Sequence, residues 1–166
     1  MMLATADYVP VSFWSVATSG ASESARFVAA QLLRGRIEAE RSQTLGAGMD
    51  RLRQDIFRVA GECSKPGWDG YGAEPISAKT FLQVQRFINA LPLGMPLPSV
   101  GAEADGHMTL EWYQNPSRVL SVSISPEGDV HYAALLGLPT RLSGTLPFLG
   151  EMPEEILRIV RRLFAA

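Results

Sequence analysis

Apolar residues follow a helical period up to about residue 91, a strand period from about residue 98, and a helical period again near the end of the chain. Apolar side chains that recur every three to four residues fall on one side of a helix. This spacing predicts helices over about residues 22–42, 49–63, 77–91 and 153–164. Ser77 stands at the N-cap position of the third helix, and Pro92 marks its end.

Apolar and polar residues alternate between the third and the last helix, which is typical of strands that bury one face. The turn sequences ADG, QNPS and SPEGD interrupt the alternation and predict an antiparallel meander with strands over about residues 98–103, 107–114, 118–125 and 129–136. RLSGTLPF adds at most an edge strand, because Pro147 has no backbone N–H. The prediction is an α+β fold: N-terminal helices, a four- to five-stranded antiparallel β-meander, and a C-terminal helix packed on one sheet face.

The strand register follows from requiring the apolar residues to share one face, since a one-residue slip would move all of them to solvent. In the hairpin closed by QNPS, this requirement places Gln114 opposite Arg118 and pairs Leu110 with Val122. The predicted core face is formed by Met108, Leu110, Trp112, Leu120, Val122, Ile124, Val130, Tyr132 and Ala134.

The first hairpin of the meander can close in two ways. A two-residue Asp105-Gly106 turn would pair Glu103 with Met108 and place a carboxylate in the core. A three-residue loop, Ala104-Asp105-Gly106 with Gly106 in the left-handed region, keeps Glu103 out of the core. We predict the three-residue loop.

The other face of the predicted sheet is polar and carries Thr109, Glu111, Tyr113, Ser121, Ser123, His131 and Ala133. A serine beside a histidine with Glu111 nearby suggests a small hydrolase, with Ser123, or alternatively Cys63, as nucleophile and His131 as base. A serine at a sheet centre lacks the sharp turn and oxyanion-hole amides of acyl transfer. Cys63 falls on the apolar stripe of a helix, where a free cysteine is usually a small core residue. We therefore favour a role other than catalysis.

The segment KPGWDGYGAEPIS, residues 65–77, connects the second and third predicted helices. Pro66 and three glycines supply the backbone shapes of a tight connection, and Trp68 can pin the connection to the core. Asp69 can bond backbone amides in the turn, but the corner itself does not require the side chains of Asp69, Tyr71 and Glu74. We favour a structural corner, with the alternative that Asp69, Tyr71 and Glu74 bind a partner.

Composition limits the number of domains and the kind of partner. The chain has 166 residues and is 46% hydrophobic, enough for one domain, which we place at residues 21–166 behind an N-terminal arm of residues 1–20. Trp14 in that arm is expected to dock on the body or on a partner. Fifteen Lys and Arg against seventeen Asp and Glu give a net charge of -2 without a basic stripe, which disfavours direct nucleic-acid binding.

The few cysteine and histidine residues argue against a disulfide and against a structural zinc site. Cys63 is a single cysteine, accompanied only by His107 and His131, and their spacing matches no zinc motif. We therefore predict no metal and no cofactor. The N-terminus lacks the pattern of a signal peptide, and no segment reaches the roughly 20 apolar residues of a membrane span, so we expect a cytoplasmic protein with no membrane partner.

Three segments, GWDGYGAEPIS, DGHMTLEW and VLSVSISPEGDVHYAALLG, resemble those of a group of small uncharacterised bacterial proteins. That group shares a WDGYGA-type corner, a DG-x-x-x-LEW strand and an SVS…PxGxxxYA hairpin. The resemblance covers about residues 66–137, and the final helix more loosely. It implies a bacterial origin and an accessory or mobile-element gene, and no catalytic residue is carried over.

These observations favour a non-enzymatic protein-interaction or regulatory module, such as an inhibitor, immunity or accessory factor of a bacterial or mobile-element system. Tyr113 and His131 on the exposed sheet face, and Trp14 on the arm, are the residues expected to bind another protein. A self-associating structural protein is the third hypothesis, with a homo-oligomer formed through the N-terminal helix or an edge strand.

Overall fold

The computed structural model describes residues 31–32 and 46–165. The chain divides into one unit, Met1–Glu40, and a second unit, Arg41–Ala166. In the first unit, residues 31–32 are helical. The predicted arm with Trp14, and the remainder of the predicted helix over residues 22–42, lie outside the described residues. The fold and the site below belong to the second unit.

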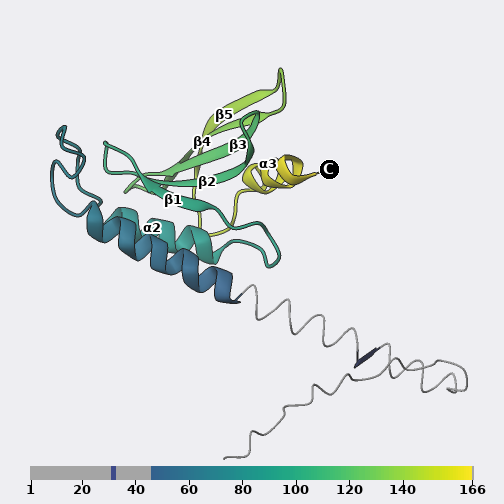
Figure 1. The fold of residues 1–166 in the computed structure, drawn as a ribbon, viewed down its shortest axis with the longest axis horizontal. Coiled ribbons are helices and arrows are strands. Elements are labelled where there is room, and N and C mark those ends of the chain that lie inside the picture. Colours follow the sequence, from purple (N-terminus) through teal and green to yellow (C-terminus); the bar gives the residue numbers. More distant parts are fainter. Residues whose placement is uncertain (1–30, 33–45, 166) are drawn as a thin grey trace, which may run out of the picture. The chain divides into compact units, whose positions relative to one another are not determined.

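Five antiparallel strands form one sheet in the order β1-β2-β3-β4-β5 (Figure 1). Each strand pairs with its neighbours in the sequence, so the predicted α+β fold with an antiparallel meander is confirmed, and RLSGTLPF forms the edge strand β5. The strands are β1 (Ser99–Ala102), β2 (Met108–Asn115), β3 (Arg118–Ile124), β4 (Asp129–Leu136) and β5 (Arg141–Pro147).

The register of the sheet agrees with the prediction at the first and third hairpins. Ala102 pairs with Met108, and Ile124 pairs with Val130. Gly106 has a φ of 81°, the left-handed conformation of the three-residue loop. Glu103 is thereby kept out of the core.

The second hairpin differs from the prediction. Arg118 pairs with Asn115 instead of Gln114, and the register shifts between Tyr113 and Asn115. The side-chain oxygen of Asn115 accepts hydrogen bonds from the backbone N–H of Ser117 at 3.0 Å and from its hydroxyl at 2.9 Å. This Asx-type turn shortens the loop by one residue and leaves Gln114 as the extra residue of a local bulge.

Three helices among residues 46–165 lie on the core face of the sheet. The first of them covers residues 46–62, and Figure 1 shows it beside α2 (Ala78–Asn89) below the sheet. The hydroxyl of Ser77 accepts the Thr80 N–H at 3.0 Å, which confirms the predicted N-cap. The last helix, α3 (Glu154–Phe164), contacts β2, β3 and β4. No helix among the described residues is long and apolar enough to cross a bilayer.

The core fills the space between these helices and the sheet, with Trp112 only 1% exposed at its centre. The indole N–H of Trp112 donates to the Pro96 carbonyl at 2.7 Å, so the ring is buried without an unsatisfied donor. Tyr132 is half-buried, and its ring covers Gly144 of β5, where a Cβ atom would lie 2.8 Å from the tyrosine oxygen. All the other predicted core-face residues of the sheet are buried.

The apolar residues of α3 form one buried stripe along the helix. Ile156, Ile159, Val160 and Leu163 are buried, and Leu157 is half-buried. Residue 159 is three positions from 156 and four from 163, so it falls on the same side of the helix, whereas 157 is rotated about 100° from 156.

Replacing Trp112 by Ala is expected to lower the free energy of unfolding by about 3–5 kcal/mol, because it removes the largest buried side chain and leaves a cavity. Urea denaturation measures this loss as a lower transition midpoint. The matched control is Tyr113→Ala, which truncates the adjacent aromatic residue, 56% exposed on the other face. Equal effects of the two variants would contradict the assignment of the faces.

Candidate functional site

The face of the sheet opposite the core carries most of the polar side chains and is ordered in cross-strand rows. The first row runs across all five strands as Gly101, Thr109, Ser123, His131 and Thr145. The second contains Ser99, Glu111, Ser121, Ala133 and Ser143, and the third contains Tyr113, Val119, Leu135 and Arg141. We call this surface the open face.

Glu103 leaves the end of β1 toward the open face and is held there by two hydroxyl groups. The Thr109 hydroxyl donates to Oε1 of Glu103, and the Ser123 hydroxyl donates to Oε2 at 3.1 Å. Both carboxylate oxygens are therefore fixed by neighbouring strands.

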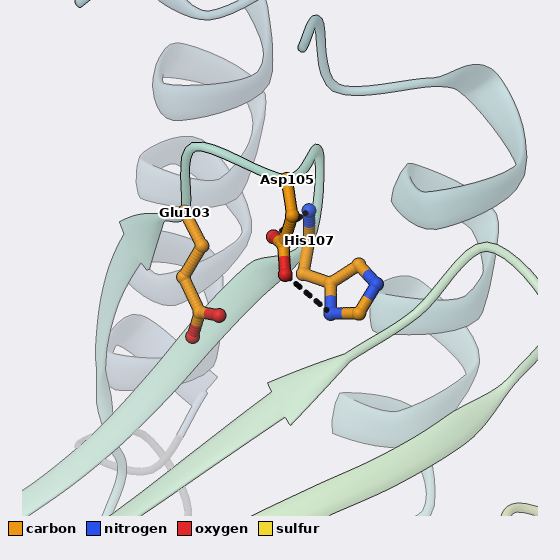
Figure 2. Close-up of side chains that lie close together, drawn as sticks. All are labelled: Glu103, Asp105 and His107. Atoms are coloured by element: carbon orange, nitrogen blue, oxygen red, sulfur yellow. Dashed lines mark hydrogen bonds and ion pairs between the residues drawn. The ribbon is translucent and has the colours of Figure 1, made fainter. Parts of the chain in front are cut away.

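His107 and Asp105 approach Glu103 from the hairpin loop (Figure 2). Nδ1 of His107 lies 3.5 Å from Oδ2 of Asp105 and 3.2 Å from the hydroxyl oxygen of Ser123. The other oxygen of Asp105 accepts the backbone N–H of His107 at 3.1 Å. Potential ligand atoms of Glu103, Asp105 and His107 all lie within 4.8 Å of one another. We call these three residues the carboxylate–histidine cluster.

His131 extends this polar region across β4. Its ring stacks on His107 with 5.7 Å between centroids and 4° between planes. Its Nδ1 lies 2.9 Å from the Thr145 hydroxyl on the edge strand. The two histidines are therefore each oriented by a hydroxyl group and by one another.

The contacts around Ser123 differ from those of a hydrolase triad. His131 faces Ser123 in the register, but its Nδ1 is engaged with Thr145, and the imidazole in contact with Ser123 is that of His107. Asp105 and Ser123 approach the same nitrogen of His107, whereas a triad uses the two ring nitrogens separately. Glu111 is exposed and pairs with Ser121, one row away.

Cys63 directly follows the helix over residues 46–62 and is buried in line with the apolar stripe of that helix. Burial raises the pKa of its thiol, and the negative charge of Glu62 adds to this shift. Both effects favour the neutral thiol over the nucleophilic thiolate.

The corner predicted between the helices supports the hairpin that carries the cluster. The backbone N–H of Glu74 donates to the Ala104 carbonyl at 2.8 Å, and the buried Thr80 hydroxyl donates to the Gly106 carbonyl at 3.2 Å. A Cβ atom on Gly106 would lie 3.2 Å from the Pro75 carbonyl oxygen. The loop containing Asp105 is therefore held on its inner side by residues from the corner and α2.

Within the corner, Asp69 has a structural role. Its Oδ1 accepts the backbone N–H groups of Tyr71 at 2.8 Å and Ala73 at 3.0 Å. These two bonds lower the pKa of its carboxyl group, the Tyr71 bond contributing most. The Trp68 indole N–H donates to the Glu74 carbonyl at 3.0 Å and closes the same turn.

The remaining predicted contact residues are separated in space. The Tyr71 side chain is 96% exposed, and the Glu74 side chain is exposed beside the hairpin. Tyr113 and His131 share the open face but belong to different rows, and Trp14 lies outside the described residues. Of these residues, His131 contacts the carboxylate–histidine cluster through its stack on His107. Glu74 reaches the hairpin of the cluster through its backbone N–H.

Apolar side chains gather at the end of the open face farthest from the cluster. One hollow of about 450 Å³ is lined by Val119, Leu135 and Arg141. A second hollow of about 310 Å³ shares Leu135 and Arg141 with it. Leu138, in the β4–β5 turn, is 89% exposed and lines the smaller hollow. We call Tyr113, Val119, Leu135, Leu138 and Arg141 the apolar end.

A cavity of about 330 Å³ lies on the helical side of the molecule, away from the cluster. Its lining includes Met49, Leu91, Leu93, Met95 and Leu97. No titratable group of the carboxylate–histidine cluster reaches it, so the apolar cavity and the polar chemistry are separate features of the described chain.

No protein family, curated protein or solved structure matched this chain. Sequence reasoning placed Glu103, Asp105 and His107 around one hairpin but did not group them. The usable signal was their spacing of two residues, which returns side chains to the same side of an extended chain.

Asp69→Asn is expected to reduce the acid sensitivity of the fold. Because two amides lower the pKa of Asp69 in the folded state, its stabilising contribution is present above its ordinary pKa of 3.8 and is lost as the pH falls through the lower folded-state value. Asparagine can accept the same two hydrogen bonds but does not titrate. Melting temperatures measured from neutral pH to about pH 2.5 should fall less for this variant. A parallel fall in both proteins would contradict the role of the carboxylate.

His131→Ala is expected to change the free energy of unfolding by less than about 0.5 kcal/mol, as is usual for substitutions away from the core. Its contacts to His107 and Thr145 lie on the open face, where water can replace them. Val130→Ala, one position earlier and fully buried, is the control and should lower stability clearly in the same urea titration. A large loss in the histidine variant would show that the open face is covered.

Proposed function

We propose that the chain is a non-enzymatic protein-binding module whose partner contacts the apolar end of the open face. The observation that carries this proposal is the row of Tyr113, Val119, Leu135 and Arg141, which crosses four strands on a face that no described helix covers. Apolar and aromatic side chains are rarely grouped on exposed surface unless they have a binding role.

The residue types of the apolar end suit a protein partner. Tyrosine and arginine are enriched at protein interfaces, because each combines a large contact area with groups that form hydrogen bonds. The 450 Å³ hollow beside the row is bounded by the small residues Ser121, Ala133 and Ser143. Such a depression next to an aromatic residue offers a pocket for an apolar side chain of a partner.

The polar composition of the rest of the open face supports a transient contact over a permanent one. The second row consists of serines, an alanine and an exposed glutamate, which tolerate water when the partner is absent. This fits a regulatory role, such as that of an inhibitor, immunity or accessory factor in a bacterial cytoplasm. The buried, single cysteine is compatible with that reducing compartment.

Site-specific photo-cross-linking tests this proposal. A benzophenone amino acid in place of Tyr113, 56% exposed, is compared with the same amino acid in place of Phe57, 62% exposed on the helix over residues 46–62. In a lysate of the native host, the Tyr113 position should capture a specific protein, because it lies at the interface. Adding Leu138→Asp, which places a charge on the apolar end, should abolish that capture.

Three outcomes would contradict the proposal: equal capture at both positions, capture only from the Phe57 position, or capture that Leu138→Asp does not change. A cross-linked pair of this chain, together with a dimer mass in light scattering, would favour self-association instead. Circular dichroism of each variant establishes that the fold is retained.

A further inference from the structure

We propose that Glu103, Asp105 and His107 form a binding site for a divalent transition-metal ion of the zinc type. The three residues supply one imidazole nitrogen and two carboxylates, converging from the end of β1, the hairpin loop and the start of β2 (Figure 2). Imidazole nitrogen together with carboxylate oxygen suits zinc and its neighbours in the first transition row. Magnesium and calcium prefer oxygen ligands alone.

The distances within the cluster are close to those of a coordination sphere. Nδ1 of His107 and Oδ2 of Asp105 are 3.5 Å apart, about the edge of a tetrahedron whose ligands lie at roughly 2.1 Å from the ion. The ligand atoms of all three residues lie within 4.8 Å of one another, whereas each pair of ligands in a tetrahedral site is roughly 3.4 Å apart, so the cluster contracts when an ion binds. The Asp105 side chain is 59% exposed, so it can rotate toward the ion during this contraction.

The charge of the cluster also favours a cation. Two carboxylates lie close together, and the arginine ion pairs within the described residues all involve other acidic groups. The hydroxyl groups of Thr109 and Ser123 donate to Glu103 but are neutral. A divalent ion beside a neutral imidazole would balance both charges.

The surroundings hold the donor groups in place before any ion arrives. Glu103 is fixed by two hydroxyl groups, and the His107 ring is stacked on His131. Such neighbouring contacts usually orient metal ligands and strengthen binding. The hairpin itself is held by the Glu74 amide and the Thr80 hydroxyl. Three protein ligands would leave room for water or for a donor from another molecule.

This site is independent of the proposed partner surface. Ser123 and Val119 are four residues apart on β3, which separates the cluster from the apolar row by about 13 Å along the strand. The two proposals therefore fail separately: variants of the cluster should not affect cross-linking from the Tyr113 position, and Leu138→Asp should not affect metal affinity.

Calorimetric titration of the full, tag-free chain with Zn²⁺ tests the site. One equivalent should bind, and Glu103→Gln, Asp105→Asn and His107→Phe should each weaken the affinity by at least about tenfold. These variants are chosen to fold. In Glu103→Gln the amide oxygen can accept from one hydroxyl group and the amide nitrogen can donate to the other. In Asp105→Asn the amide oxygen can still accept the His107 N–H, and in His107→Phe the ring can still stack on His131. Asp129→Asn, on the neighbouring strand β4, is the matched control and should bind as the native chain does. Mg²⁺ should bind much more weakly than Zn²⁺.

A second measurement uses the unmodified protein, so the test does not depend on any variant. In ¹⁵N-labelled protein, Zn²⁺ should shift the imidazole nitrogen signals of His107 much more than those of His131. The proposal is overturned by an absence of saturable Zn²⁺ binding, by equal affinity of the three cluster variants and the native chain, or by a shift confined to His131. Equal affinity for Mg²⁺ would overturn the assignment to a transition metal.

Discussion

The burial of one face of the five-stranded sheet is the constraint on which the other features depend. Side chains alternate along each strand, so fixing Trp112 and Leu110 in the core leaves no freedom in what the opposite face displays. The register that buries Met108 also brings Thr109, Ser123 and His131 into one row. The polar site is therefore a geometric consequence of the apolar core, and a slip that disrupted one would disrupt the other.

The open face is divided into two regions of different chemistry by its middle row. Ser121, Ala133 and Ser143 are too small to fill the space between the rows, which produces the hollow beside the apolar end. On the other side of this row, hydroxyl groups of threonine and serine bond to charged or titratable side chains. Apolar contact and ionic chemistry are thus kept apart on one surface, and each can be tested without disturbing the other.

The sequence was sufficient for the parts of the fold that hydrophobic burial decides. The first hairpin was predictable because the shorter turn would have buried the carboxylate of Glu103, a cost of several kcal/mol that a single glycine conformation avoids. The second hairpin was not, because Asn115 bonds to Ser117 through its side chain. This side-chain bond to the turn changes the length of the loop, and the alternation of apolar residues does not reveal it.

The carboxylate–histidine cluster was beyond such reasoning because it depends on side-chain directions. The register pairs Ser123 with His131, yet the Ser123 hydroxyl contacts Glu103 and His107, neither of which lies in the same row. Residues at the end of a strand and in a loop follow the local path of the chain, and this path is set by the loop closure at Gly106 and by what packs beneath it. The alternation of apolar and polar residues predicts the face on which a side chain lies, but not its contacts with residues of a neighbouring loop.

The corner at residues 65–77 supplies what packs beneath that loop, and this changes how its charged residues should be interpreted. Asp69 is occupied by backbone amides inside the turn, and Glu74 acts through its backbone N–H on the Ala104 carbonyl. Trp68 closes the turn through the Glu74 carbonyl, so both backbone groups of Glu74 are engaged, one inside the corner and one on the hairpin. A residue conspicuous for its charge therefore contributes through its main chain. The corner bears on function indirectly, by holding the loop that presents Asp105 and His107.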